Sequence, residues 1–212
     1  MNLALSPRDR VLFLGDSVTD ADRNRADGAD LGAGYAAAAA ARLFARPALA
    51  GIAVFNRGVG GDRAQDVLAR LGPDCLDLAP TVVSLLVGIN DTWRRFDSGL
   101  TTTAAQYSEC YRTILTRIVA ACPAVRLILI EPFVVPVSPE QWFWRSDLDP
   151  RIAVVRRAAL DFGAALIPAD GMFAAAAAAA GRSRALADDG VHPTAEGHRL
   201  LAEAWLALFD AA

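Results

Sequence analysis

A serine stands directly after the first apolar stretch of the chain, in the sequence GDSVTD at residues 15–20. Gly15 permits a tight turn, which would leave the Ser17 hydroxyl exposed at the edge of a sheet and its N–H free. A nucleophilic serine needs this exposure and a nearby base. The same residues also fit a simpler interpretation, in which the serine or the aspartate caps the start of a helix.

An aspartate and a histidine three positions apart lie near the other end of the chain, in DGVHP at residues 189–193. Around a turn the two can share one hydrogen bond, through which Asp189 would fix the tautomer of His192 and stabilise its imidazolium form. The chain has only two histidines. We expect the other, His198, to be a surface or packing residue in the middle of a helix.

Two further polar segments could supply hydrogen-bond donors. NRGVGGD at residues 56–62 contains glycines that let backbone N–H groups approach a ligand closely. The alternative is a phosphate-binding turn, although the GxGxxG spacing is incomplete. GIND at residues 88–91 offers the neutral side-chain amide of Asn90, which suits an oxyanion. A simple Asx turn would explain the same residues.

The elements that must position these residues can be predicted from the pattern of apolar stretches. Short stretches flanked by Gly or Pro are typical of strands buried on both faces. They lie at residues 11–14, 52–55, 81–87, 127–130 and 164–167. Helical patterns lie at residues 35–45, 64–71, 106–121, 150–162, 173–180 and 194–209. Gly181 is placed to end the alanine-rich helix.

This alternation predicts an α/β fold: a three-layer α/β/α sandwich with a five-stranded parallel, flavodoxin-like sheet. We expect a single domain over residues 1–212. In such sheets ligands bind at the carboxyl ends of the strands. A nucleophile, a base with its orienting group, and oxyanion donors would then meet at one edge, as acyl transfer requires.

Residues 136–149 show no helical period and are expected to form a loop. The loop carries Trp142, Phe143 and Trp144. A long aromatic loop in a small domain often covers a site. It would equally serve as a hydrophobic cap that does not touch a substrate.

Composition excludes several classes of function. The net charge of −3 lacks the basic excess of nucleic-acid-binding proteins, and no basic patch suits an anionic membrane. No apolar stretch approaches the roughly 20 residues of a membrane span, and the first ten residues lack the pattern of a signal peptide. The three cysteines form no CxxC spacing, which favours free thiols and a cytoplasmic protein. No cluster of metal ligands is present in the sequence.

The four polar segments together resemble the SGNH hydrolases, also called GDSL-like esterases. Residues 15–17 match the first block of that family, Gly61 the second, residues 88–91 the third and residues 189–193 the fifth. The resemblance implies that Ser17 is the nucleophile and that His192 is the general base, oriented by Asp189. It implies an oxyanion hole made by the N–H groups of Ser17 and Gly61 and the side-chain amide of Asn90. It implies no metal and no cofactor.

A closer resemblance is to the intracellular acetylxylan esterases of this superfamily. It rests on Thr19-Asp20 with Arg23, on LGAGY at residues 31–35, and on NDTWR at residues 90–94. It implies a small-molecule ester substrate, acetylated xylo-oligosaccharides, and a homo-oligomer. Trp93 could limit the acyl pocket or stack on a sugar, or simply pack in the core. Trp142 and Trp144 are further candidates for substrate contact.

Two rival functions remain open on the sequence. A lysophospholipase or thioesterase would use the same triad on a longer acyl chain and would need an apolar groove. A flavodoxin-like module that binds a nucleotide or flavin would have no use for Asn90, Asp189 or His192.

Overall fold

Five parallel strands form the centre of the computed structural model, which describes residues 4–210. They are β1 (Arg10–Gly15), β2 (Ala53–Gly58), β3 (Val82–Leu86), β4 (Arg126–Ile130) and β5 (Ala165–Ile167). Their order in the sheet is β2-β1-β3-β4-β5. The order of the strands reverses between β1 and β3, which is the place where flavodoxin-like sheets bind ligands.

The strands have apolar residues at consecutive positions because both faces of the sheet are covered. In β1, the side chains of Val11 and Phe13 belong to the core on one face, and those of Leu12 and Leu14 to the core on the other. All four are fully buried. Successive side chains of a strand point to opposite faces, so a sheet with two buried faces needs this pattern.

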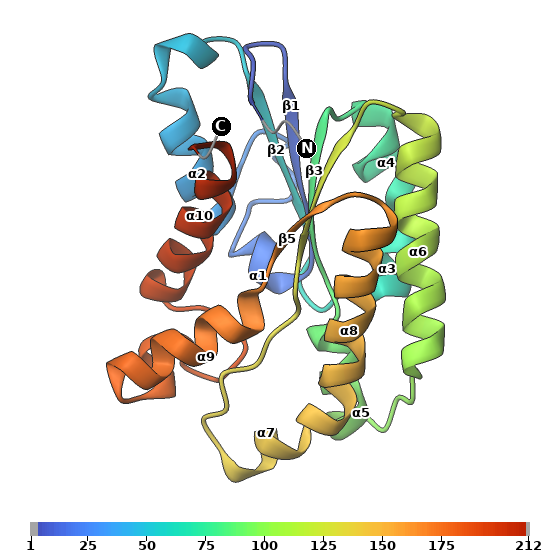
Figure 1. Cartoon of the computed structure of the whole chain (residues 1–212), viewed down its shortest axis with the longest axis vertical. Helices are drawn as coiled ribbons and strands as arrows, with labels where there is room; N and C mark the ends of the chain where they lie inside the picture. Colours follow the sequence, from blue (N-terminus) through green and yellow to red (C-terminus); the bar gives the residue numbers. More distant parts are fainter. Residues whose placement is uncertain (1–3, 211–212) are drawn as a thin grey trace.

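Helices cover the two faces as separate layers (Figure 1). One layer contains α2 (Tyr35–Phe44), α9 (Ala169–Ala180) and α10 (Ala195–Asp210). The other contains α3 (Ala64–Ala69), α4 (Leu71–Asp74), α6 (Ala104–Ala121) and α8 (Arg145–Asp161). Three further helices, α1 (Ser17–Asp20), α5 (Ile89–Asp97) and α7 (Pro139–Phe143), lie toward the carboxyl ends of the strands. The predicted three-layer α/β/α fold is therefore confirmed.

The prediction of a loop over residues 136–149 is wrong. The segment contains α7 and the first five residues of α8, so Pro150 lies inside a helix instead of starting one. Trp144, Leu148 and Ile152 are spaced four apart and are buried together, as one face of a helix requires. Pro150 concealed this period because proline usually ends a helical pattern.

The remaining differences are smaller. The GIND segment opens α5, a helix that the sequence did not predict, and α9 begins four residues earlier than expected. Gly181 ends α9 with φ = +68°, as predicted. Between residues 4 and 210, no helix is long and apolar enough to cross a membrane. The predicted domain also includes residues 1–3 and 211–212, which lie outside the described residues. Residues 1–3 are also part of the amino-terminal segment that was compared with a signal peptide.

Candidate active site

Ser17 is the first residue of α1, directly after the end of β1. Asp16 caps this short helix, and its Oδ1 accepts a hydrogen bond from the N–H of Val18 at 3.0 Å. Gly15 makes the turn possible, because a Cβ at this position would lie 2.2 Å from the carbonyl oxygen of Leu86. The capping role falls to the aspartate, and the hydroxyl of Ser17 lies 2.9 Å from Nε2 of His192.

The turn before α10 brings Asp189 against His192. Nδ1 of His192 lies 2.6 Å from Oδ2 of Asp189. The other oxygen, Oδ1, accepts hydrogen bonds from the backbone N–H groups of Val191 at 2.9 Å and His192 at 2.7 Å. Gly190 has φ = +88°, a left-handed conformation that glycine adopts without strain. The backbone of the turn therefore fixes one carboxylate oxygen, and the other faces the imidazole.

These contacts set the protonation of the pair. Burial alone would raise the pKa of Asp189, but the hydrogen bonds from the imidazole and from two backbone N–H groups lower it to about 2. The hydrogen bond to Asp189 raises the pKa of His192 above its ordinary value. With an ionised acceptor at Nδ1, neutral His192 carries its proton there and presents an unprotonated Nε2 to Ser17. A proton can then pass from the serine hydroxyl to the imidazole.

The predicted oxyanion donors lie on the neighbouring loops. Gly61 follows β2 with φ = +88°, and Gly60 packs against Ser17, since a Cβ on Gly60 would lie 3.9 Å from the Cβ of Ser17. One N–H of the Asn90 amide donates to the carbonyl oxygen of Asp62 at 3.0 Å, which ties the start of α5 to the glycine loop. Within residues 4–210, the N–H groups of Ser17 and Gly61 have no protein acceptor and are available to an oxyanion.

Two ion-pairing residues support these loops: the partly buried Arg70, which the sequence did not single out, and the buried Asp20. The guanidinium of Arg70 donates to the carbonyl oxygens of Gly15 at 2.9 Å and Arg57 at 2.8 Å, and to the carboxylate of Asp62 at 2.6 Å. It thereby joins the ends of β1 and β2 to the glycine loop. The carboxylate of Asp20 accepts the N–H of Gly60 at 2.9 Å. Only the tertiary structure brings these groups together.

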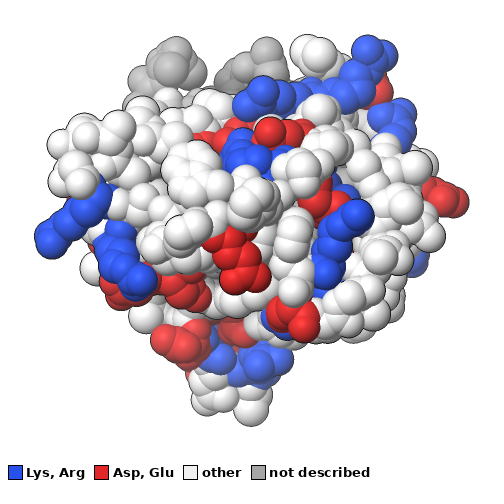
Figure 2. Space-filling model, turned by 90° about the horizontal axis from the view of Figure 1, so that it is seen from below, with Lys and Arg blue, Asp and Glu red and all other residues white. Residues whose placement is uncertain are grey.

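A pocket of about 600 Å³ opens above Ser17 and His192. Its wall combines apolar surface with the ionisable side chains of Asp20, Asp22, Arg23, Arg25 and His198. Figure 2 views the end of the molecule at which the strands reach their carboxyl termini, and acidic and basic side chains are interspersed across it. The site therefore suits a polar, uncharged ligand better than a polyanion.

Comparison with known proteins agrees with this geometry. Residues 13–200 match the model of the GDSL-like Lipase/Acylhydrolase family. The chain belongs to this family. An acetylxylan esterase of Geobacillus stearothermophilus is 33% identical over 204 residues, which cover 93% of this chain and 92% of the relative. The chain is thus a carboxylic ester hydrolase.

Solved structures show the same likeness. A crystal structure of an acetylxylan esterase from Geobacillus stearothermophilus superposes with a TM-score of 0.87 at 31% identity, over 99% of this chain and 96% of that one. An alpha/beta hydrolase enzyme from the metagenome of Lake Arreo, Spain, superposes with a TM-score of 0.86 at 28% identity, over 97% of both chains.

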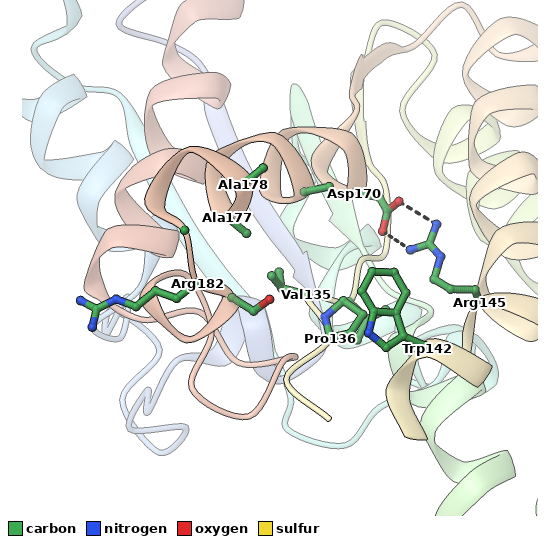
Figure 3. Close-up of a pocket in the computed structure, with 12 residues that line it drawn as sticks. Val135, Pro136, Trp142, Arg145, Asp170, Ala177, Ala178 and Arg182 are labelled. Atoms are coloured by element: carbon green, nitrogen blue, oxygen red, sulfur yellow. Dashed lines mark hydrogen bonds and ion pairs between the residues drawn. The ribbon is translucent and has the colours of Figure 1, made fainter. Parts of the chain in front are cut away.

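The three candidate tryptophans occupy different places in the esterase. The ring of Trp93 lies 5.8 Å from the ring of His192 and 5.6 Å from that of Trp144. Trp144 is only 4% exposed and packs behind Trp93. Trp142 is 63% exposed and lines a second pocket, between α7 and α9 (Figure 3). The structure therefore places one of the three, Trp93, beside His192.

His198 lies in α10 and is a packing residue. Its Nδ1 accepts the N–H of Tyr35 at 3.2 Å, and the two rings are stacked with centroids 6.5 Å apart. Burial lowers the pKa of His198 to about 4, so this ring stays neutral near pH 7. It lines the pocket, and the imidazole that contacts the Ser17 hydroxyl is that of His192.

Proposed function

We propose that this esterase removes small acyl groups, acetyl above all, from acetylated carbohydrate such as xylo-oligosaccharides. The observation that carries the proposal is the set of ionisable side chains in the wall of the pocket that contains Ser17 and His192. A sugar presents hydroxyl groups in many directions, and side chains such as Asp20, Asp22 and Arg25 can exchange hydrogen bonds with them. A long acyl chain would find fewer apolar partners here than in the pocket that Trp142 lines.

A more apolar pocket lies elsewhere in the described part of the chain. It also measures about 600 Å³, and it is lined by Val134, Val135, Pro136, Trp142 and the alanines of α9. It shares no lining residue with the pocket of Ser17 and His192. This separation favours a short acyl group over the lysophospholipase or thioesterase alternative, which needs an apolar groove that reaches the nucleophile.

Related solved structures support the proposed residues and substrate. They are those of an acetyl-xylooligosaccharide esterase and of catalytic mutants of it in which a serine, an aspartate and a histidine are each replaced by alanine. In that relative the aspartate and the histidine are three positions apart, as Asp189 and His192 are here. The serine precedes the histidine by nearly the whole chain in both proteins.

In the proposed mechanism, Ser17 attacks the ester carbonyl carbon while Nε2 of His192 takes the hydroxyl proton. The developing oxyanion is stabilised by the N–H groups of Ser17 and Gly61 and by the amide of Asn90. His192 then returns the proton to the leaving alcohol. Water attacks the acyl-serine, again with His192 as base, and restores the free enzyme. Asp189 remains ionised throughout because its pKa is about 2.

The test is hydrolysis of 4-nitrophenyl acetate and 4-nitrophenyl octanoate by the wild-type protein, by Ser17→Ala and by Ser98→Ala. Ser98 is exposed at the end of α5 and serves as the matched control. We expect a preference for the acetate that Ser17→Ala abolishes and Ser98→Ala leaves unchanged, followed by release of acetate from acetylated xylo-oligosaccharides. A preference for the octanoate would favour the long-chain alternative, and activity retained in Ser17→Ala would refute the mechanism.

A further inference from the structure

The turn that carries Asp189 and His192 is held from outside by the segment that follows β4. The N–H of Val135 donates to the carbonyl oxygen of Gly190 at 2.8 Å. The side-chain amide of Gln141 donates to the carbonyl oxygen of Asp189 at 2.6 Å. The hydrogen bonds inside the turn fix the carboxylate relative to the imidazole, and these two fix the turn relative to the sheet.

Gln141 is placed to make this contact in only one orientation. It lies on α7 and is 8% exposed. Its Oε1 accepts the N–H of Val137 at 2.8 Å, so the amide nitrogen faces Asp189 and the oxygen does not. Flipping the amide would break both hydrogen bonds at once.

The same amide packs directly on the backbone of Gly190. A Cβ at Gly190 would lie 2.5 Å from Oε1 and 2.8 Å from Nε2 of Gln141. The absence of a side chain at Gly190 therefore does two things: it permits the left-handed φ, and it lets the glutamine reach the turn. This is a close fit between two segments 48 residues apart in the sequence.

We propose that Gln141 is a positioning residue of the esterase, which holds the 189–192 turn where Nε2 of His192 meets the Ser17 hydroxyl. The proposal rests on the proposed function, in which His192 is the base. Gln141 touches neither Ser17 nor the pocket above it. Its neighbour Trp142 faces the apolar pocket shown in Figure 3, so one short helix forms the wall of that pocket and also supports the catalytic turn.

The test replaces Gln141 with methionine, which has a similar length but forms neither hydrogen bond. With 4-nitrophenyl acetate we expect kcat to fall about 10- to 100-fold, because small displacements of a catalytic group carry losses of this order. KM should change less than about threefold, because α7 does not line the pocket of Ser17 and His192. Gln106→Glu is the control, since Glu replaces Gln readily in the helix-capping box that Gln106 forms with Thr103.

A second measurement separates positioning from a general loss of structure. NMR titration of the two histidines should show a lower pKa for His192 in Gln141→Met, because the imidazole then aligns less well with Asp189. The other titratable groups that face His192 are Asp16, Asp22 and His198, and the substitution leaves them in place. His198 is the internal control, with an unchanged pKa.

If Gln141→Met does not fold, Gln141→Asn takes its place, because its amide is one methylene too short to reach both partners. A folded variant with unchanged kcat and an unchanged pKa of His192 would overturn the proposal. The histidine titration distinguishes failure of this proposal from failure of the proposed function. Failure of that function would appear as wild-type hydrolysis that does not depend on Ser17, whereas the histidine titration reports on Gln141 in either case.

Discussion

Nε2 of His192 lies 2.9 Å from the hydroxyl oxygen of Ser17, across 175 residues of sequence. The serine comes from the end of β1 and the histidine from the turn before α10. Neither element would place its residue correctly without the sheet between them. Nearly the whole fold therefore contributes to the contact between Ser17 and His192.

The first prediction concerns the acid side of the pH profile. In the proposed mechanism His192 must be neutral to take the proton from Ser17, so activity should fall as pH drops through the pKa of His192. The hydrogen bond that Nδ1 of His192 donates to Asp189 raises that pKa, so the midpoint of the loss in kcat/KM should lie above the ordinary histidine value of about 6.5. A midpoint clearly below that value would contradict the Asp189–His192 contact.

Asp189→Asn should move this midpoint to lower pH and reduce kcat by on the order of 10³- to 10⁴-fold, because the imidazole loses its charged acceptor and its preferred tautomer. Asp188→Asn is the matched control: Asp188 is the exposed preceding residue, and its side chain makes no hydrogen bond to His192. Equal effects of the two substitutions on the pH profile would argue against a specific role for Asp189.

The second prediction concerns Asn90. Its amide is 2% exposed and uses one N–H to bind the carbonyl oxygen of Asp62, which leaves the other for the oxyanion. Asn90→Ala should therefore lower kcat about 10²- to 10³-fold with little change in KM, because the donor acts on charge that develops in the transition state. Exposed Asn24 supplies the control, Asn24→Ala. A rise in KM at unchanged kcat would assign Asn90 to ground-state binding instead.

The sequence predicted much of this site because of how parallel sheets are built. Each polar segment directly follows an apolar strand or precedes a helix, and the carboxyl ends of parallel strands share one edge. The segments of Ser17, Gly61 and Asn90 therefore had to lie close together once the strands were recognised. The Asp189–His192 contact could be predicted because the two residues are three positions apart around a turn.

Contacts that depend on tertiary structure were not predictable. Arg70 with Asp74 reads as an ordinary pair four residues apart on a helix, and that ion pair does form. The guanidinium also binds the carbonyl oxygens of Gly15 and Arg57, and a backbone acceptor leaves no signal in the sequence. Pro150 led to a wrong prediction, because proline usually ends a helix. Trp144 and Leu148 nevertheless lie at the start of α8, which continues through Pro150.

The third prediction compares two tryptophans. Trp93 packs between His192 and Trp144, whereas Trp142 lines the separate apolar pocket. Trp93→Ala should reduce kcat for 4-nitrophenyl acetate about tenfold, because the imidazole loses a neighbour that restricts its motion. Trp142→Ala should leave kcat and KM within about twofold. The reverse order of effects would place the substrate against α7.

The fourth prediction concerns stability. Asp91 is 1% exposed in the first turn of α5, and its Oδ2 accepts the N–H of Ala64 at 3.0 Å. Burial raises its pKa to about 6, above the value of about 3.9 in an unfolded chain. The folded state therefore binds this proton more tightly. The resulting stabilisation is complete below about pH 4 and is lost as the pH rises through about 6.

Asp91→Asn keeps an oxygen acceptor for Ala64 and removes the buried charge. Its Tm should therefore fall less than that of the wild type between pH 4 and pH 8, and at pH 8 the variant should be the more stable of the two. Asp16, whose pKa burial raises to about 7, acts in the same direction, so part of the decline remains. Exposed Asp77 provides the control, Asp77→Asn, which should follow the wild type at every pH. If Asp91→Asn instead lowered Tm at pH 8, the ionised carboxylate would be stabilising in the folded protein, and burial would not be the dominant influence on Asp91.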